Sequence, residues 1–250
     1  MIGLGLGLSM DEVPGSGFVP TDLGAKLVLW LQNTETGGTI TDQSGTDGTS
    51  ANRMTWRDAS GNNNHAFQDT TANKPTIAEG GMDFELDNAD HLDLVSSIDG
   101  GHPNPFTVSV VVKRESSGAQ TTFLGGGSTE FITFKSADDK IGVRTAGTNA
   151  TNSTITFDES DLWPIDSKFI LTVTKSADGV LKFYKNGVIA QESSGENSVN
   201  QGQTLDFNVV GTKVGSTGPF DGVIYELIYC NVVLSDDNLS KLHGWLNQYI

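Results

Sequence analysis

Phe106-Thr-Val-Ser-Val-Val-Val-Lys113 decides the fold class of this chain. Most of its residues are β-branched, which favours a strand over a helix. Its apolar positions are nearly continuous, as in a strand that lies inside a sheet with both faces covered. We therefore expect a sheet that extends to both sides of this segment.

Short apolar segments separated by turn residues flank this strand along the whole chain. The sequence contains 30 glycines, and clusters of turn residues recur about every 8–12 residues, as in β-sandwiches and barrels. Asn186-Gly187 between Val180–Lys185 and Val188–Gln191 predicts a tight hairpin. The other predicted strands are Lys26–Leu31, Met82–Leu86 with its alternation continued at Leu92 and Leu94, Phe131–Phe134, Ile141–Arg144, Thr154–Phe157, Phe169–Thr174, Val209–Val214 and Val223–Tyr229.

The C-terminal part has a helical period instead. Ser235 is a good N-cap, and two aspartates follow it in the first turn, where the helix dipole favours anions. Apolar residues then recur at spacings of three and four, which predicts a helix near Ser235–Gln248 that lies on the sheet. We expect His243 of this helix at the surface, and a long loop at Gln32–Asn52.

Composition narrows the classes of function. A chain of 250 residues fits one domain with at most a short appendage. The formal net charge of −16 argues against nucleic-acid binding and against anionic membranes. Cys230 is the only cysteine, which excludes an internal disulfide and a thiolate metal site. No apolar run approaches the ~20 residues that span a bilayer.

Four segments carry a family resemblance. The most specific is Trp56–Ala66, which reads W-R-D-A-S-G-N-N-N-H-A and matches the pattern W-x-D-x-S-G-N-x-N-x-A. The others are Leu27–Leu31, Phe84–Leu92, and Phe220–Tyr229 with the Leu234–Asp237 segment that follows it. In order and spacing they resemble the laminin-G-like branch of the concanavalin A-like jelly rolls. The resemblance implies an all-β, two-sheet antiparallel jelly-roll sandwich with a C-terminal helix over residues 26–250.

The Asp58 turn within this motif has two interpretations. The Asp58 carboxylate can accept backbone N–H groups while Gly61 takes a positive φ, which is a turn-closing role. Alternatively, Asp58, Asn62 and Asn64 offer the hard oxygens that calcium prefers, although their spacing is not that of an EF-hand. We favour the turn and expect no cofactor, with calcium as the open alternative.

Glu85-Leu-Asp87-Asn-Ala-Asp90 resembles the E-x-D-x-x-E motif of glucanases with the same fold. In a strand, Glu85 and Asp87 share one face, whereas Asp90 joins them only through a bulge. Aspartate at the last position also shortens the reach of the acid. The four histidines are scattered without a metalloprotease or esterase motif. We therefore predict a protein that is not an enzyme, with no catalytic residues.

The N-terminus, Met1-Ile-Gly-Leu-Gly-Leu-Gly-Leu-Ser-Met10, alternates glycine and leucine. It has no cationic start and no unbroken apolar stretch, so we do not interpret it as a secretory signal. We interpret residues 1–25 as a docking arm and hinge, in which Leu4, Leu6 and Leu8 pair with another polypeptide by β-augmentation. A second copy of the chain is one possible partner.

Two functions remain. Glycine–leucine openings before a laminin-G-like domain resemble virion proteins of tailed bacteriophages. This implies a capsid decoration or fibre component that is located in the virion, docks on other virion proteins and also binds a cell-surface glycan. The alternative is a carbohydrate-binding module of a bacterial surface or secreted protein, located outside the cell.

Overall fold

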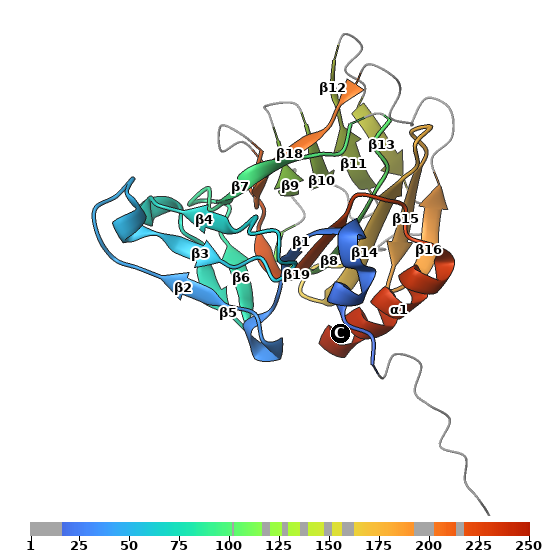
Figure 1. Cartoon of the computed structure of the whole chain (residues 1–250). Coiled ribbons are helices and arrows are strands. Elements are labelled where there is room, and N and C mark those ends of the chain that lie inside the picture. Colours follow the sequence, from blue (N-terminus) through green and yellow to red (C-terminus); the bar gives the residue numbers. More distant parts are fainter. Residues whose placement is uncertain are drawn as a thin grey trace, which may run out of the picture.

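Two antiparallel sheets pack face to face, with a single α-helix on the outside of one of them (Figure 1). The computed structural model describes residues 17–101, 103–116, 121–126, 130–135, 140–147, 152–156, 163–192, 203–213 and 218–250. Over these residues the predicted jelly-roll sandwich with a C-terminal helix is confirmed. Within the same residues, no helix is long and apolar enough to cross a membrane.

The first sheet, sheet A, has the strand order β16-β15-β14-β8-β19-β6-β5, and β1 pairs with β19 beside this path. Its strands are β1 (Leu27–Leu31), β5 (Thr76–Ala78), β6 (Gly81–Phe84), β8 (Phe106–Arg114), β14 (Lys168–Lys175), β15 (Leu181–Lys185), β16 (Val188–Glu192) and β19 (Gly222–Cys230).

The second sheet, sheet B, has the order β13-β11-β10-β9-β18-β7-β4-β3-β2. Its strands are β2 (Ile40–Asp42), β3 (Met54–Trp56), β4 (Ala66–Gln68), β7 (Leu92–Asp99), β9 (Thr121–Gly125), β10 (Phe131–Phe134), β11 (Lys140–Arg144), β13 (Asn152–Thr156) and β18 (Asp206–Val210). A separate short pair joins β12 (Ala146–Gly147) to β17 (Gln203–Thr204). The helices are α1 (Asp236–Leu246) and the 3-10 turns η1 (Pro20–Lys26), η2 (Thr34–Thr36), η3 (Ser50–Asn52), η4 (Thr71–Asn73) and η6 (Asn247–Tyr249).

The predicted central strands lie where their composition places them. β8 is flanked by β14 and β19, and all nine residues of β19 are buried. Asn186 and Gly187 form the predicted hairpin turn, with φ of 49° and 84°, the signs that a type I′ turn requires. Ser235 caps α1 by accepting the N–H of Asn238.

Two predicted strands differ from the structure. β18 starts and ends earlier than Val209–Val214, because the chain turns at Gly211, which has a φ of 86°. A Cβ atom there would lie 2.3 Å from the Phe84 ring. The alternation from Met82 to Leu94 is also divided between two sheets, since β6 belongs to sheet A and β7 to sheet B.

The buried apolar residues form two layers. The larger layer fills the space between the sheets and includes the fully buried Trp56. The smaller layer lies between sheet A and the elements outside it, α1 and η1. Leu23 is buried in this layer and Phe18 packs against it. The domain therefore begins no later than Phe18, earlier than the predicted boundary at residue 26.

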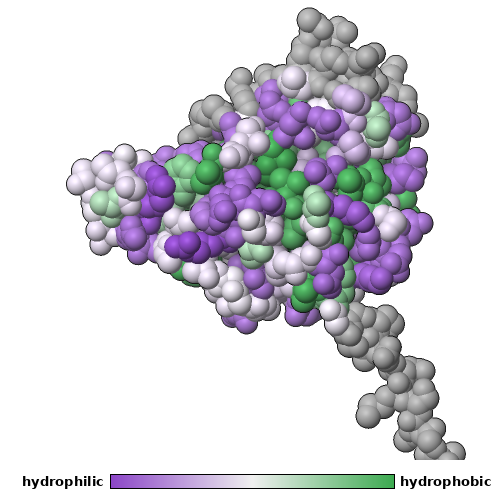
Figure 2. Space-filling model, in the orientation of Figure 1, coloured by the Kyte–Doolittle hydropathy of each residue, from purple (hydrophilic) through white to green (hydrophobic). Residues whose placement is uncertain are grey.

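The segment predicted as a long loop, residues 32–52, contains η2, β2 and η3. With β3, β4 and β5, β2 forms a projection on one side of the sandwich (Figure 1). Hydrophilic side chains cover much of this projection, whereas hydrophobic ones gather nearer the middle of the same face (Figure 2).

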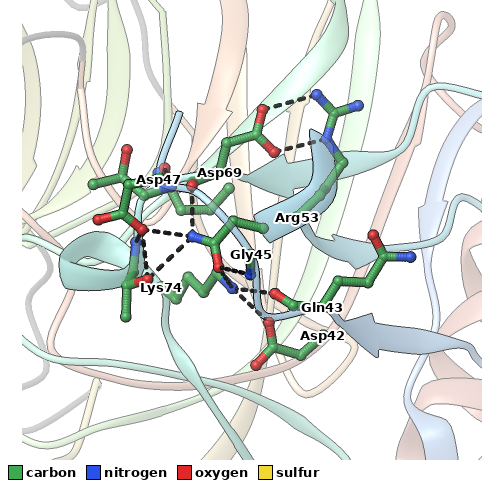
Figure 3. Close-up of polar contacts among 11 residues, drawn as sticks. Asp42, Gln43, Gly45, Asp47, Arg53, Asp69 and Lys74 are labelled. Carbon is green, nitrogen blue, oxygen red and sulfur yellow. Dashed lines mark hydrogen bonds and ion pairs between the residues drawn. The ribbon is translucent and has the colours of Figure 1, made fainter. Parts of the chain in front are cut away.

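A polar network stabilises the projection (Figure 3). The Asn52 amide donates to Asp47 Oδ1 at 2.7 Å and to the carbonyl of Asp69 at 2.8 Å. Arg53 forms a two-pronged ion pair with the Asp69 carboxylate, at 2.8 Å for both contacts. Lys74 Nζ donates to the carbonyl of Gln43 at 2.9 Å. These contacts connect the chain before β3 to the chain after β4. They therefore explain why residues 32–52 fold onto the neighbouring strands and do not form an open loop.

Along one side of β19 the paired strand changes from β6 to β1, and Glu226 lies between these two stretches. Its carboxyl group is fully buried and accepts hydrogen bonds from the Trp30 indole N–H and, at 2.8 Å, from the backbone N–H of Asn33. Tyr249 is hydrogen-bonded to the same group. Burial raises the pKa of Glu226 to about 8, while the bonds from Asn33 and Trp30 oppose this shift.

This pKa predicts a specific pH dependence of stability. Between pH 4.5, the ordinary pKa of glutamate, and about 8, the folded protein keeps a proton that the unfolded chain has lost. The contribution of Glu226 to the free energy of unfolding therefore falls as pH rises through this window. The free energy of unfolding of the wild type minus that of Glu226→Gln should therefore decrease as pH rises from 4.5 to about 8. Urea denaturation at several pH values in this range measures the difference. A slope equal to that of the exposed-site control Glu192→Gln would contradict the raised pKa.

Candidate ligand-binding groove

The predicted site at Asp58 is a turn closed by hydrogen bonds. Asp58 Oδ1 accepts the N–H of Trp30 at 3.0 Å and that of Ser60 at 2.9 Å. Oδ2 accepts the Ser60 hydroxyl at 2.8 Å and the N–H of Asn64 at 2.9 Å. Gly61 takes the expected positive φ of 90°. The carboxylate thus has the turn-closing role, with four protein donors on its two oxygens.

The other two calcium candidates contact the flanking strands. The Asn62 amide donates to the carbonyl of Leu27 at 2.9 Å, and Asn64 Oδ1 accepts the N–H of Ser96 at 2.7 Å. Leu27 belongs to sheet A and Ser96 to sheet B, so the turn joins the two sheets. Within the described ranges, no three His, Cys, Asp or Glu side chains gather as a metal site would need. A calcium ion at Asp58, Asn62 and Asn64 would compete with these hydrogen bonds.

The carboxylates that resemble a glucanase motif differ in their exposure to solvent. β6 ends at Phe84, so Glu85 and Asp87 lie beyond the strand, and both are exposed. Asp90 is only 1% exposed, and its Oδ2 accepts the backbone N–H of Glu85 at 3.1 Å. Burial raises the pKa of Asp90. Asp90 is therefore buried and holds the turn, whereas the other two carboxylates are exposed.

A groove lies between the β15–β16 hairpin and α1. It has a volume of about 500 Å³, within the range of small-molecule sites. Both elements contribute polar and aromatic side chains. The lining residues are Tyr184, Asn186, Gly187, Val188, Asp236, Leu239, Ser240, His243, Gly244 and Asn247.

The hairpin wall of the groove is fixed by its turn. Asn186 Oδ1 accepts the backbone N–H of Ile170 at 2.8 Å, and the Asn186 N–H donates to the Ile170 carbonyl at 2.9 Å. At Gly187, a Cβ atom would lie 3.2 Å from the Cβ of His243. Hydrogen bonds at Asn186 thus hold the turn on β14, and the turn contacts the helix closely at Gly187.

His243 forms the floor of the groove, which corrects the expectation that it lies at the surface. It is 6% exposed, and its Nε2 is hydrogen-bonded to Thr172 Oγ1 at 3.0 Å. Thr172 in turn contacts Ser109 Oγ at 2.8 Å. Burial lowers the pKa of His243 to about 4, so the imidazole is neutral at physiological pH.

Tyr184 stands over this floor. Its ring centroid is 5.8 Å from that of His243, with the two planes at 45°. Burial raises the pKa of Tyr184, so its hydroxyl is protonated and can both donate and accept. Among the residues that the structure describes, the side chains of Tyr184, Asp236 and Ser240 have no hydrogen-bond partner. The groove therefore presents a ring face beside free polar groups.

Sequence reasoning did not find this groove. One signal was present: Asp236, Ser240, Gly244 and Asn247 recur at helical spacing on the face beside the apolar stripe. The other wall lies some fifty residues earlier, and only the tertiary structure brings the hairpin to the helix.

Thr172 supports His243 at the floor of the groove, so removal of the Thr172 hydroxyl should lower the free energy of unfolding. In Thr172→Val, both His243 Nε2 and Ser109 Oγ lose a buried partner, so we expect a loss of about 1–3 kcal/mol in the free energy of unfolding. The control is Thr174→Val on the same face of β14, where the structure shows no side-chain hydrogen bond. Equal stability of the two variants in urea denaturation would contradict the bridge.

The fold recurs in solved structures of low sequence identity. The binding domain of Paraclostridial mosquitocidal protein 1 matches at a TM-score of 0.59 and 14% identity, over 90% of this chain and 52% of that one. The receptor-binding domain of botulinum neurotoxin D gives 0.51 and 14%, over 91% and 54%. Trypanosoma rangeli sialidase in complex with 2,3-difluoro-KDN gives 0.52 and 14%, over 89% and 33%. The chain thus spans about half of the two toxin chains and a third of the sialidase.

These likenesses concern the fold. No curated protein matches the sequence. A laminin-G family model, described as the concanavalin A-like lectin/glucanases superfamily, matches residues 86–240. That region covers more than half of the chain and extends from β7 to the first five residues of α1. The chain belongs to the concanavalin A-like lectin/glucanases superfamily.

Proposed function

We propose that this protein is a non-enzymatic carbohydrate-binding module that holds a saccharide in the groove between the β15–β16 hairpin and α1. The observation that carries the proposal is the half-buried Tyr184 ring, packed on His243, beside polar side chains of the helix that have no hydrogen-bond partner among the described residues. We place the module outside the cell or on a cell surface.

The chemistry of the groove suits a sugar. A pyranose has an apolar C–H face, which packs on an aromatic ring, and hydroxyl groups that both donate and accept hydrogen bonds. Tyr184 supplies the ring, Asp236 accepts, and Ser240 can do either. The fixed turn at Gly187 reduces the entropy that binding would otherwise cost.

The comparisons support a recognition role over catalysis. Two of the matched structures are a binding domain and a receptor-binding domain, and the superfamily includes lectins as well as glucanases. The burial of Asp90, which accepts the backbone N–H of Glu85, opposes glycoside hydrolysis, which needs two carboxyl groups that reach the substrate.

Binding to a panel of neutral saccharides tests the proposal. Tyr184→Ala should weaken binding at least about tenfold, because it removes the stacking surface, and Tyr184→Phe should retain most of it. Asp236→Asn and Ser240→Ala should weaken it less. The matched control is Lys241→Ala on α1, outside the groove. A glycan array followed by calorimetry measures these effects.

Two outcomes would contradict the proposal. One is saccharide binding that Tyr184→Ala and Lys241→Ala leave equally unchanged, since the groove would then not be the site. The other is release of reducing sugar that disappears in Glu85→Gln, since the protein would then be a glycosidase.

We further propose that the module serves in a virion, docked by its N-terminal arm. Leu4, Leu6 and Leu8 lie outside the described residues, so this proposal rests on the sequence alone. Phe18 and Leu23 pack on the sandwich, which limits the proposed arm to residues 1–16. Other virion proteins or a second copy of the chain would receive its leucines.

Deletion of residues 1–16 tests the arm. The truncated protein should keep its melting temperature, because the buried layer that contains Phe18 and Leu23 is retained. It should lose assembly into the particle or oligomer, measured by co-sedimentation and light scattering. A loss of several degrees in melting temperature would instead place the arm within the fold.

A further inference from the structure

Sheet B carries an aromatic ring on its outer face. In β10, Ile132 and Phe134 point into the layer between the sheets, so Phe131, which alternates with them, faces outward. Its register partners on β9 and β11 are Gly125 and Arg144. These three residues form one row across three strands.

Three cations surround this ring. Lys213 Nζ lies 4.9 Å from the centroid of Phe131, and Lys135 Nζ and the guanidinium carbon of Arg144 each lie 5.8 Å from it. The whole chain has only 15 Lys and Arg against 31 Asp and Glu. A cluster of three cations in so acidic a protein is therefore a distinct local feature.

No carboxylate in the described part of the chain pairs with the cations of this cluster. Across the described ranges, Lys135, Arg144 and Lys213 form no ion pair. Burial, followed by Arg144 and Lys213, lowers the pKa of Lys135. Burial and then Arg144 lower the pKa of Lys213. Among the described residues no carboxylate is a cause of either shift, whereas the neighbouring cations of the cluster are.

Two glycines make room for this arrangement. At Gly142, a Cβ atom would lie 2.4 Å from Cε of Lys135, so the lysine side chain lies across β11. At Gly125, a Cβ atom would lie 2.9 Å from the Cα of Lys213, so the chain after β18 passes close over β9. A cation–π contact with one ring needs only one cation. Three cations around one ring repel one another, and an anion bound among them would offset this repulsion.

We propose that Lys135, Arg144 and Lys213 form a binding site for an oxyanion, the sulfate or carboxylate group of an acidic saccharide or the free ion. The planar guanidinium of Arg144 can bind two oxygens at once, and the lysines contribute point charges. Phe131 forms the floor and holds the cations apart. This site is separate from the groove at α1 and does not depend on its function.

An NMR titration of the full chain with sodium sulfate at constant ionic strength tests the site. Amide shifts of β10 and β11 should saturate in the wild type and in Lys26→Gln, which removes an exposed lysine elsewhere. Arg144→Gln and Lys213→Gln should each weaken binding at least about tenfold, because each removes a charge-assisted contact. Arg144→Lys should lose less than Arg144→Gln. The Lys26→Gln control also separates binding from the general stabilising effect of sulfate.

A second arm identifies the source of the anion. A sulfated disaccharide that binds more tightly than free sulfate, while its unsulfated counterpart does not bind at this site, would assign the site to an acidic saccharide. Equal affinity for sulfate and the sulfated sugar would assign it to a free oxyanion. Shifts that do not saturate, or that saturate equally in Lys213→Gln and Lys26→Gln, would overturn the site.

Discussion

A carboxyl group in the middle of sheet A is the constraint on which the other elements depend. β19 pairs with β6 along Gly222–Ile224 and with β1 along Leu227–Cys230, and Glu226 lies between these two stretches. Its carboxyl oxygens accept hydrogen bonds from the Trp30 indole N–H and the Asn33 backbone N–H. No neighbouring strand provides an acceptor for these two groups. The chain after Asn33 then bonds to the turn between β5 and β6. One buried carboxyl group thus sets the direction of the projection beside the sandwich.

Features that depend on neighbouring residues could be predicted from the sequence. The Asn186-Gly187 turn, the Ser235 cap and the Asp58 turn each follow from the chemistry of a few adjacent positions. The role of His243 could not be predicted in this way, because its partner Thr172 lies 71 residues away. A helical histidine beside an apolar stripe is compatible with either face until the sheet beneath it is known.

The cation cluster shows a second limit of the sequence. Lys135 and Arg144 are scattered charges until the pairing of β10 with β11 is known, and Lys213 reaches them only because the chain crosses Gly125. Alternation predicts which face of a strand a residue takes, but not which sheet it joins. For the same reason, β6 and β7 looked like parts of one alternating stretch. Net charge was equally uninformative, since an acidic chain can still carry a local cationic site.

The order of pairing in sheet A has a consequence for synthesis. β19 is the last strand of the chain, yet it joins β8 to β1 and to β6. A nascent chain leaving the ribosome therefore holds β1, β6 and β8 without the strand that unites them, and their apolar faces stay exposed until Cys230 has emerged. Domains dominated by such distant contacts fold slowly. The core of this domain can therefore be completed only after β19 has emerged, and the incomplete sheet is exposed to aggregation until then.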